Sequence, residues 1–488
     1  MTDHPHANRT DAVLVYAIHR THDWWRHVAD HLGFERAVVL TDRRGEGDRW
    51  VTDAFYAAWR RHRRSRATAS PLLTEAEVDD VIRRCRVLRS QPRRRAVAMA
   101  LAMVEAMEEI LLDLQPGFVV SFPIDNYVQD VLARRARAHG ATYFELTASA
   151  LPDMCMLMHR GRLVSAAEEP AHDLVEAKVR QIADPLFTPA YVQNATAFTA
   201  ARFLKVLAYF QIRSVFFRLY ALMRRDGLNT HYFDAQTTLL HKPKIRDIRI
   251  LGMVDPDWEA KLDGHPRERR VLFGLQLFPE AAIDYWIDDP RLLDHEDMLV
   301  EAARRLTEAG FQILVKDHPL QFGFRQVALI ERLAALPNVV IVPYEVSGNR
   351  MLEVCGINLT ATGTLGLQSA LMGSRSVTGE AYYANPEDFI LLRTWDDLAR
   401  LADRVEETPP PTSLRRRQER IVRQLLRGSF TADFFSFRGF DPAHPNPAAA
   451  ALGQALGERI RRLGPEGEAW HARNMPANGG GHVGSPLN

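Results

Sequence analysis

The chain has few of the features that assign a protein to a particular class. Its 488 residues include only three cysteines, Cys85, Cys155 and Cys355, which are scattered and show no metal-ligand spacing. We therefore expect a reduced, intracellular protein without a disulfide framework or a structural zinc site. The formal net charge is +1, so no overall positive field favours nucleic acid as a partner.

Long apolar segments are also missing. The amino-terminal residues MTDHPHANRTD are polar and do not contain the apolar core of a signal peptide. No uninterrupted apolar run reaches the roughly 20 residues that a membrane-spanning helix needs. We therefore expect a cytoplasmic protein.

One section, residues 170–225, is nevertheless rich in bulky apolar side chains. A helical wheel places Arg202, Lys205, Tyr209, Arg213 and Arg224 on one stripe. One interpretation is a core or interdomain helix whose basic stripe faces water. The other is an interfacial helix on an anionic membrane, because Lys and Arg beside aromatic and apolar side chains suit the lipid headgroup boundary. The second interpretation predicts peripheral contact with the cytoplasmic face of the inner membrane.

What the sequence does contain is an alternation of short apolar runs with amphipathic segments. Runs rich in Val, Ile and Leu begin at Ala12, Ala37, Phe118 and Ala141, and similar runs recur within residues 271–369. This alternation predicts an α/β protein with doubly wound parallel sheets. The length exceeds what one hydrophobic core usually serves, so we predict two such domains. No G-x-G-x-x-G follows the first run, and a dinucleotide-binding fold is not indicated.

Changes in composition suggest where the parts of the chain begin and end. We predict a first domain over residues 1–150 and a helical insertion with the interdomain connection over residues 151–264. The second domain covers residues 265–408, and helices over residues 409–474 cross back to the first domain. Residues 475–488, rich in Gly, Pro and Asn, are predicted to be disordered.

Polar side chains follow the predicted strands of the second domain. In open α/β sheets, ligands bind beyond the carboxyl ends of the strands. Gln276 with Glu280, Lys316 with His318, and residues 362–364 should therefore converge on one cleft. This cleft is the candidate active site.

The glycine-containing turn near Gly363 and the strand end near His318 both suit a phosphate. A helix that begins after Gly363 and Thr364 would offer free N–H groups and the positive end of its dipole. The alternative is an ordinary strand-to-helix turn with Thr as the N-cap. Lys316 and His318 supply a cation and an imidazole, which can neutralise a phosphate or donate a proton to it.

Two carboxylates stand close together after the first strand of this domain. Glu280 and Asp284 are one helical turn apart and would share a face. Such a pair can divide acid and base roles between its members, whereas the alternative is that Glu280 merely caps the helix. In the first domain, residues 19–23 and Asp125 follow predicted strands and would face an acceptor.

Three segments of the second domain resemble the motifs of a known family. LQLFPE (275–280), VKDHP (315–319) and ATGTLGLQSALMG (361–373) follow the order Q-x-x-P-E, K-[DE]-H-P and G-T-x-x-x-E-A. This order resembles that of bacterial capsule and surface polysaccharide biosynthesis proteins, a family that includes the β-Kdo transferases. The resemblance covers roughly residues 271–384, and the first domain matches only in its general layout.

The resemblance implies a GT-B glycosyltransferase. In this fold two Rossmann-like parallel-sheet domains face a cleft, and the donor is a nucleotide-activated sugar, CMP-Kdo in the best understood members. The family motifs give active-site roles to Glu280 and His318. The sequence departs from them at Phe278, where Gln is usual, at Gln368, where Glu is expected, and at residues 374–376, which lack the usual Pro. Gln368 can hydrogen-bond a ribose but cannot act as a carboxylate.

These observations define the candidate site residues. The catalytic candidates are Glu280, His318, Asp284 and Asp125. The candidates for binding the nucleotide sugar are Gln276, Lys316, Pro319, Thr362, Gly363, Thr364, Gln368 and Ser369. The adjacent pair Asp288 and Asp289 lacks the spacing of a metal-binding D-x-D, so we expect no metal and no cofactor beside the nucleotide-sugar substrate, which we expect to be CMP-linked.

The predicted function is therefore a metal-independent glycosyltransferase. It would transfer a sugar, Kdo or a related acid, to a bacterial surface or capsular polysaccharide or to its lipid-linked primer. One alternative is a nucleotide-sugar epimerase or hydrolase on the same architecture, since a fold does not fix a function. The other is a non-catalytic polysaccharide-assembly adaptor, which Phe278 and Gln368 suggest.

Overall fold

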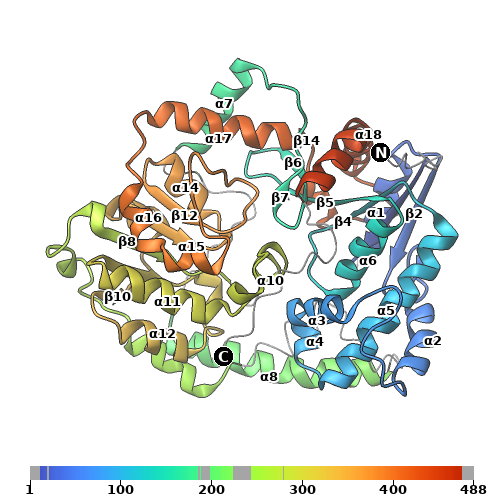
Figure 1. Ribbon diagram of the computed structural model, residues 1–488, viewed down its shortest axis with the longest axis horizontal. Coiled ribbons are helices and arrows are strands. Elements are labelled where there is room, and N and C mark those ends of the chain that lie inside the picture. Colours follow the sequence, from blue (N-terminus) through green and yellow to red (C-terminus); the bar gives the residue numbers. More distant parts are fainter. Residues whose placement is uncertain are drawn as a thin grey trace, which may run out of the picture.

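Two α/β domains make up the chain, each built on its own sheet (Figure 1). The computed structural model describes residues 11–18, 21–184, 187, 198–223, 243–277 and 280–474. Residues 19 and 20 of the predicted acceptor loop lie outside the described residues. So do Phe278, Arg224 and the predicted disordered tail over residues 475–488.

The first sheet has eight strands and follows the order β14-β6-β5-β4-β1-β2-β3, with β7 paired to β6. Its centre, from β5 to β3, is parallel, whereas β6, β7 and β14 pair antiparallel. The strands are β1 (Ala12–Ala17), β2 (Arg36–Thr41), β3 (Arg49–Trp50), β4 (Phe118–Ser121), β5 (Thr142–Ala148), β6 (Met154–His159), β7 (Arg162–Leu163) and β14 (Ser429–Thr431). β1 is buried along its whole length, as expected for a central strand covered on both faces.

Helices cover this sheet, and two of them show how the sequence sets their ends. They are α1 (His22–Asp30), α2 (Thr52–His62), α3 (Glu75–Arg84), α4 (Arg86–Arg89), α5 (Arg93–Leu114) and α6 (Tyr127–Ala138). α3 starts with a capping box in which Thr74 and Glu77 satisfy each other's backbone N–H groups. It ends because Cys85 adopts an extended conformation, which turns the chain before α4.

The second sheet has six parallel strands in the order β10-β9-β8-β11-β12-β13. The strands are β8 (Arg270–Gly274), β9 (Gln312–Lys316), β10 (Val339–Ile341), β11 (Ile357–Thr360), β12 (Arg375–Thr378) and β13 (Ile390–Leu391). The helices are α10 (Ala281–Trp286), η4 (Pro290–Leu293), α11 (His295–Glu308), η5 (Pro319–Gln321), α12 (Val327–Ala334), α13 (Gly348–Val354), α14 (Leu365–Leu371), α15 (Trp395–Ala399) and α16 (Leu401–Glu407). Counted along the chain, this is the order 3-2-1-4-5-6 of doubly wound folds.

The remaining helices connect the two domains. The insertion contains α7 (His172–Ile182) and α8 (Ala200–Met223), and the connection contains the 3-10 helices η1 (Ile245–Gly252), η2 (Ala260–Leu262) and η3 (Arg267–Arg269). After the second domain, α17 (Leu414–Gly428), η6 (Phe434–Phe437) and α18 (Pro447–Asn474) follow. α18 returns to the first domain, where Leu452, Leu456 and Ile460 join the core that also contains Trp25 of α1.

The expectation of two doubly wound α/β domains with a helical insertion is confirmed. The first sheet continues beyond residue 150, however, because β6 and β7 extend it at one edge. These strands are antiparallel and need only short turns, so the helical insertion begins after them rather than at residue 151. β14 then pairs with β6 and ties the carboxyl-terminal part of the chain to this edge.

Candidate active site

The site is built at the point of the second sheet where the strand order reverses. β8 and β11 are neighbours there, and the chain leaves them toward opposite sides. Gln276 follows β8, and its Nε2 donates a hydrogen bond of 2.8 Å to Oγ1 of Thr362, which follows β11. The backbone N–H of Thr362 donates to Oε1 of Gln276 at 2.9 Å. The amide side chain of Gln276 therefore joins the two strand ends.

Glu280 lies beside this amide. Nε2 of Gln276 also donates to Oε2 of Glu280, at 3.0 Å. Glu280 occupies the N-cap position of α10, but its side chain makes no capping hydrogen bond, so capping does not explain the carboxylate. Burial raises the pKa of Glu280 to about 7, although the hydrogen bond from Gln276 acts in the opposite direction. A carboxyl group with this pKa exchanges its proton near neutral pH, as a general acid or base must.

The end of β9 is held next to the end of β8 by a buried arginine. Nη2 of Arg325 donates to the backbone oxygen of Gln276 at 2.7 Å and to Oδ1 of Asp317 at 2.7 Å. The hydroxyl of Tyr344 donates to Oδ2 of Asp317 at 2.5 Å. Oδ1 of Asp317 also accepts from the backbone N–H of His318 at 2.8 Å. Asp317 is thus saturated with donors and fixes the backbone at His318.

The hydrogen bonds of His318 define which of its ring nitrogens is available. Nδ1 accepts a hydrogen bond from the backbone N–H of Leu320 at 3.1 Å, at the start of η5, where Pro319 is the first residue. Burial lowers the pKa of His318 below its ordinary value. The neutral ring therefore carries its proton on Nε2. In this state the ring is uncharged, and its Nε2–H is able to donate a hydrogen bond to a ligand.

Lys316 is placed differently from what its charge suggested. Nζ donates to the backbone oxygens of Asp317 and Tyr344, each at 3.1 Å, and lies 5.6 Å from the ring centroid of Tyr344. Desolvation lowers the pKa of Lys316 to about 8. The ammonium group therefore ties β9 to the residues that follow β10, and its third donor has no partner among the residues that the structure describes.

The turn after β11 has the expected position at the start of α14. No hydrogen bond to the backbone N–H groups of Gly363 or Thr364 occurs within the described part of the chain. Thr364 is the N-cap, and its side chain makes no capping bond. The backbone oxygen of Gly363 accepts from the hydroxyl of Tyr383 at 2.6 Å, which fixes the turn. α14 has only seven residues, so its dipole contributes less than that of a long helix.

Gln368 and Ser369 both lie on α14, beyond the turn. Nε2 of Gln368 donates to the backbone oxygen of Phe187 at 3.1 Å and is therefore engaged with the insertion. Ser369 has an exposed fraction of 0%. It points into the interior because α14 packs this face against the core, and we remove Ser369 from the candidate binding residues. Apart from Asp284, which lies within α10, the other candidates of the second domain end or follow β8, β9 and β11.

Sequence reasoning missed two arginines of the first domain, Arg86 and Arg89 on α4. Nε of Arg86 lies 3.1 Å from Oδ2 of Asp284, and Nη2 of Arg89 lies 2.9 Å from Oδ1 of the same residue. Nη2 of Arg86 also pairs with the carboxylate of Asp125. Arg86 thus joins Asp125, which follows β4 at the switch point of the first sheet, to Asp284 in the second domain.

These ion pairs distinguish the three candidate carboxylates. Asp284 is 1% exposed as a side chain, accepts a hydrogen bond from Arg89 and forms an ion pair with Arg86. Burial lowers the pKa of Arg86, but the carboxylates of Asp125 and Asp284 raise it well above its ordinary value, so Arg86 stays charged. Asp125 and Asp284 therefore balance Arg86 and Arg89. Burial raises the pKa of Asp284 as well, although Arg89 and Arg86 act in the opposite direction. Glu280 is the additional carboxyl group of the cluster, and its pKa of about 7 suits it to gain or lose a proton near neutral pH.

The sequence did contain a sign of these arginines. RRCRVLR at residues 83–89 places four arginines within seven residues, among buried Val and Leu. A charged run of this kind usually lies on a solvated helix face. The helix break at Cys85 turns the arginines inward, and no Gly or Pro in the sequence indicates this break.

No group of three or more side chains that could hold a metal ion occurs in the part of the chain that the structure describes.

Part of the chain matches a known protein family. Residues 245–387 match a family described as capsule polysaccharide biosynthesis protein, whereas no curated protein matches the chain. KpsC of Thermosulfurimonas dismutans, described as a beta Kdo 2,7 transferase, is 11% identical over 72% of this chain and 89% of its own, with a TM-score of 0.31. KpsC of the same organism, described as a beta Kdo 2,4 transferase, is 15% identical over 63% and 79%, with a TM-score of 0.28.

A further solved structure is an enzyme with a different activity. UDP-GlcNAc 2-epimerase of Methanocaldococcus jannaschii, in complex with UDP-GlcNAc and UDP, is 12% identical over 85% of this chain and 99% of its own, with a TM-score of 0.26. At these identities and TM-scores, the solved structures indicate no substrate for this chain. The match over residues 245–387 contains all the candidate residues except Asp125.

Proposed function

We propose, from the match of residues 245–387 to the capsule polysaccharide biosynthesis family, that this chain is a glycosyltransferase. It moves a sugar from a nucleotide donor, with CMP-Kdo as the first candidate, to a surface or capsular polysaccharide or its lipid-linked primer. One observation carries the proposal: Glu280, with its pKa raised to about 7, lies at the switch point of the second sheet and is hydrogen-bonded by Gln276.

The proposed mechanism has two parts, one at the acceptor hydroxyl and one at the departing phosphate. Glu280, when ionised, accepts the proton of the acceptor hydroxyl as that oxygen attacks the sugar. The departing phosphate gains negative charge, which the Nε2–H of His318 and the backbone N–H groups of Gly363 and Thr364 stabilise. These donors act through hydrogen bonds, so we propose that transfer needs no metal ion. Retention of activity in EDTA would support this point.

A donor and acceptor assay tests the proposal. The protein is incubated with CMP-Kdo, UDP-sugars or GDP-sugars, with and without a lipid-linked or oligosaccharide acceptor, and the products are identified by mass spectrometry. A transferase forms the new glycan only when the acceptor is present. A new nucleotide sugar formed from the donor alone would indicate an epimerase, and free sugar would indicate a hydrolase.

A binding assay distinguishes a protein that binds no nucleotide sugar from an active one that was given an unsuitable acceptor. A ligand bound only by the native state raises the melting temperature, so the same donors are screened by thermal shift. Stabilisation by one nucleotide that Gln276→Ala abolishes would locate the site at the end of β8. If no nucleotide stabilised the protein and none was turned over, the glycosyltransferase proposal would be wrong and the adaptor function favoured.

We also propose that α8 contacts an anionic membrane. Most of the exposed large hydrophobic side chains in the described part of the chain lie on this helix, including Ile212 at 72% and Met223 at 81%. Spacings of three, four and seven residues place Ile212, Val215, Phe216 and Leu219 on one face. Phe203 and Phe210 instead contact Phe322 and Phe324 of the second domain, so the exposed face points away from the protein.

Charge favours lipid over another apolar partner. The sequence of α8 contains Arg202, Lys205, Arg213 and Arg218 but no Asp or Glu, which suits anionic headgroups. Within the residues that the structure describes, no helix is both long and apolar enough to cross a bilayer. The proposed contact is therefore peripheral, and it would bring the site to a lipid-linked acceptor at the inner membrane.

Liposome flotation tests this contact. The protein should float with vesicles containing phosphatidylglycerol, less with phosphatidylcholine alone, and less as salt screens the charges. Ile212→Ser with Phe216→Ser should abolish flotation, whereas Leu174→Ser, an exposed apolar residue on α7, is the matched control. Equal flotation of the α8 variant and the control would rule the contact out.

A further inference from the structure

α10, the helix that begins after Glu280, is shared by the two domains. Figure 1 shows it between the two lobes. Tyr285 belongs to the hydrophobic core of the first domain, whereas Ile283 and the adjoining Ile287 belong to that of the second. The position of Glu280 therefore depends on both domains, although the residue is part of the second.

Arg84 of the first domain binds backbone oxygens at the carboxyl-terminal end of α10. Its Nη1 donates to the backbone oxygens of Asp284 at 3.1 Å and Ile287 at 2.6 Å. Its Nη2 donates to the backbone oxygen of Asp288 at 3.2 Å. Carbonyls at the end of a helix lack partners within the helix, and a guanidinium from another domain satisfies them here.

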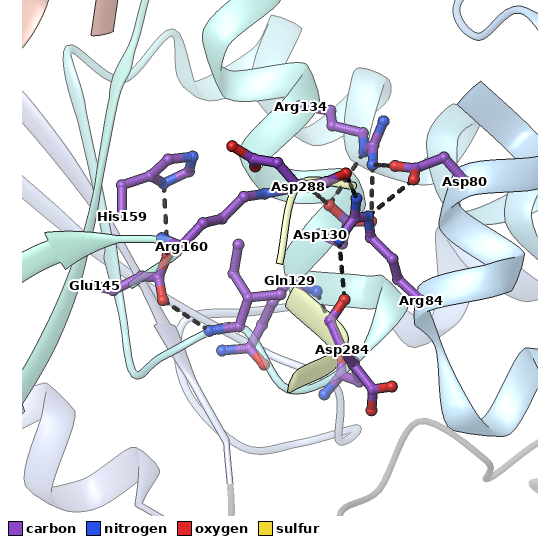
Figure 2. Close-up of polar contacts among 12 residues, drawn as sticks. Asp80, Arg84, Gln129, Asp130, Arg134, Glu145, His159, Arg160, Asp284 and Asp288 are labelled. Atoms are coloured by element: carbon purple, nitrogen blue, oxygen red, sulfur yellow. Dashed lines mark hydrogen bonds and ion pairs between the residues drawn. The ribbon is translucent and has the colours of Figure 1, made fainter. Parts of the chain in front are cut away.

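Arg84 is itself fixed by a buried ionic cluster, which Figure 2 shows. Its Nε donates to Oδ1 of Asp80 at 2.9 Å. Asp80 also pairs with Arg134, and Arg134 and Arg160 share Asp130 of α6. Burial raises the pKa of Asp80, but Arg84, Arg134 and Arg160 lower it to about 2. Asp80 therefore stays ionised and keeps the guanidinium of Arg84 oriented toward α10.

We propose that Arg84 is a positioning residue that sets the orientation and the water exposure of Glu280 from the opposite end of α10. α10 has six residues, so its ends are only about 9 Å apart. A short, hydrogen-bonded helix moves as a unit, and a shift at its Arg84 end displaces its Glu280 end. The catalytic consequence rests on the proposed function, whereas the positioning of Glu280 does not.

A substrate-free measurement tests the positioning. The wild type and its variants are labelled with 13Cδ glutamate, and the Glu280 signal is assigned by its loss in Glu280→Gln. The groups that face Glu280 are Gln276, Asp284, Arg86 and Asp125, and none of them is changed. Arg84→Gln should lower the titration midpoint of Glu280 by at least about one pH unit, because burial is the largest cause of its raised value and a loosened α10 admits water.

Two further variants keep the result interpretable. Arg83→Gln is the matched control, because Arg83 is the preceding residue and also reaches the second domain, at Asp294 (3.3 Å), but does not hold α10. Its midpoint should equal that of the wild type. Arg84→Lys keeps the charge beside Asp80 but cannot reach all three carbonyls, so its midpoint should fall between those of the wild type and Arg84→Gln.

The outcomes separate this inference from the proposed function. An unchanged midpoint in folded Arg84→Gln would overturn the inference, and so would an unchanged midpoint in Arg84→Lys if Arg84→Gln did not fold. If the wild type transferred no sugar, the proposed function would fail while the titration still decided the role of Arg84. With an active wild type, Arg84→Gln should lower kcat about tenfold or more with little change in KM for the donor, and should shift the acidic limb of the pH profile.

Discussion

The raised pKa of Glu280 predicts a dependence of stability on pH that Glu280→Gln removes. In the unfolded chain the carboxyl group ionises with a pKa near 4.5, whereas in the folded protein burial raises this value to about 7. Between these values the folded state binds more protons than the unfolded state. The free energy of unfolding therefore falls as pH rises from 4.5 to 7, and the loss is complete above pH 7.

The size of the effect follows from the difference between the two values. At about 1.4 kcal/mol for each pH unit, the partly buried carboxylate lowers the free energy of unfolding by roughly 3 kcal/mol at pH 8. Glutamine retains the size of the side chain and an oxygen that accepts from Gln276. Glu280→Gln should therefore be more stable than the wild type by roughly 3 kcal/mol at pH 8, with little difference at pH 4.5.

Urea denaturation followed by tryptophan fluorescence at pH 4.5, 6 and 8 measures this difference. Glu145, whose pKa burial also raises to about 7, is present in both proteins, so its contribution cancels. The matched control is Glu109→Gln, at an exposed residue of α5. The difference in urea midpoint between this variant and the wild type should be the same at all three pH values. If Glu280→Gln and the wild type differed by the same amount at all three pH values, Glu280 would not titrate near neutral pH and its role as a base would be refuted.

Three other variants test neighbouring parts of the site. His318→Ala should lower turnover on the order of a hundredfold, because one preorganised donor to the leaving phosphate is lost, while the dissociation constant of the donor, measured by calorimetry, changes less. Asp284→Asn should lower the free energy of unfolding by roughly 3 kcal/mol, since Arg86 loses a buried partner. The control is Asp294→Asn, which removes an exposed ion pair and should change the free energy of unfolding by less than about 1 kcal/mol. Ser369→Ala should leave donor affinity unchanged, and a tenfold loss would restore Ser369 to the binding site.

The fold could be predicted from the sequence because its strands are continuous apolar runs. The strand beginning at Ala12 and the strand before Lys316 are buried on both faces, and such runs stand out from the amphipathic helices between them. The residues that follow the strands were predictable for the same reason, since parallel strands bring their carboxyl ends to one edge. Gln276 and Thr362, 86 residues apart, are hydrogen-bonded as that rule requires.

The contacts between the domains could not be predicted in this way. Arg84, Arg86 and Arg89 act through their orientation, which depends on the extended conformation of Cys85 between two helices. The periodicity of apolar residues predicts which face of a single helix is buried. It does not predict a break between two helices, such as the one at Cys85, when no Gly or Pro is present there. The burial of Ser369 was missed because a seven-residue helix is too short for its inner face to be read from periodicity.

Glu280 and Asp284 are four residues apart on one short element, yet their surroundings give them different chemistry. Asp284 is directed toward the first domain, where Arg89 and Arg86 pair with it and oppose the rise in its pKa that burial causes. Glu280 is directed toward the second domain, where a neutral amide is its hydrogen-bond partner, and burial without a full ion pair favours the protonated form. A reaction that moves a proton needs a group whose two states are close in energy. The domain interface provides this at Glu280 because Asp125 and Asp284 balance the arginines. Among the described residues of this cluster, the carboxyl group that exchanges a proton near neutral pH is therefore the one without an ion pair to an arginine.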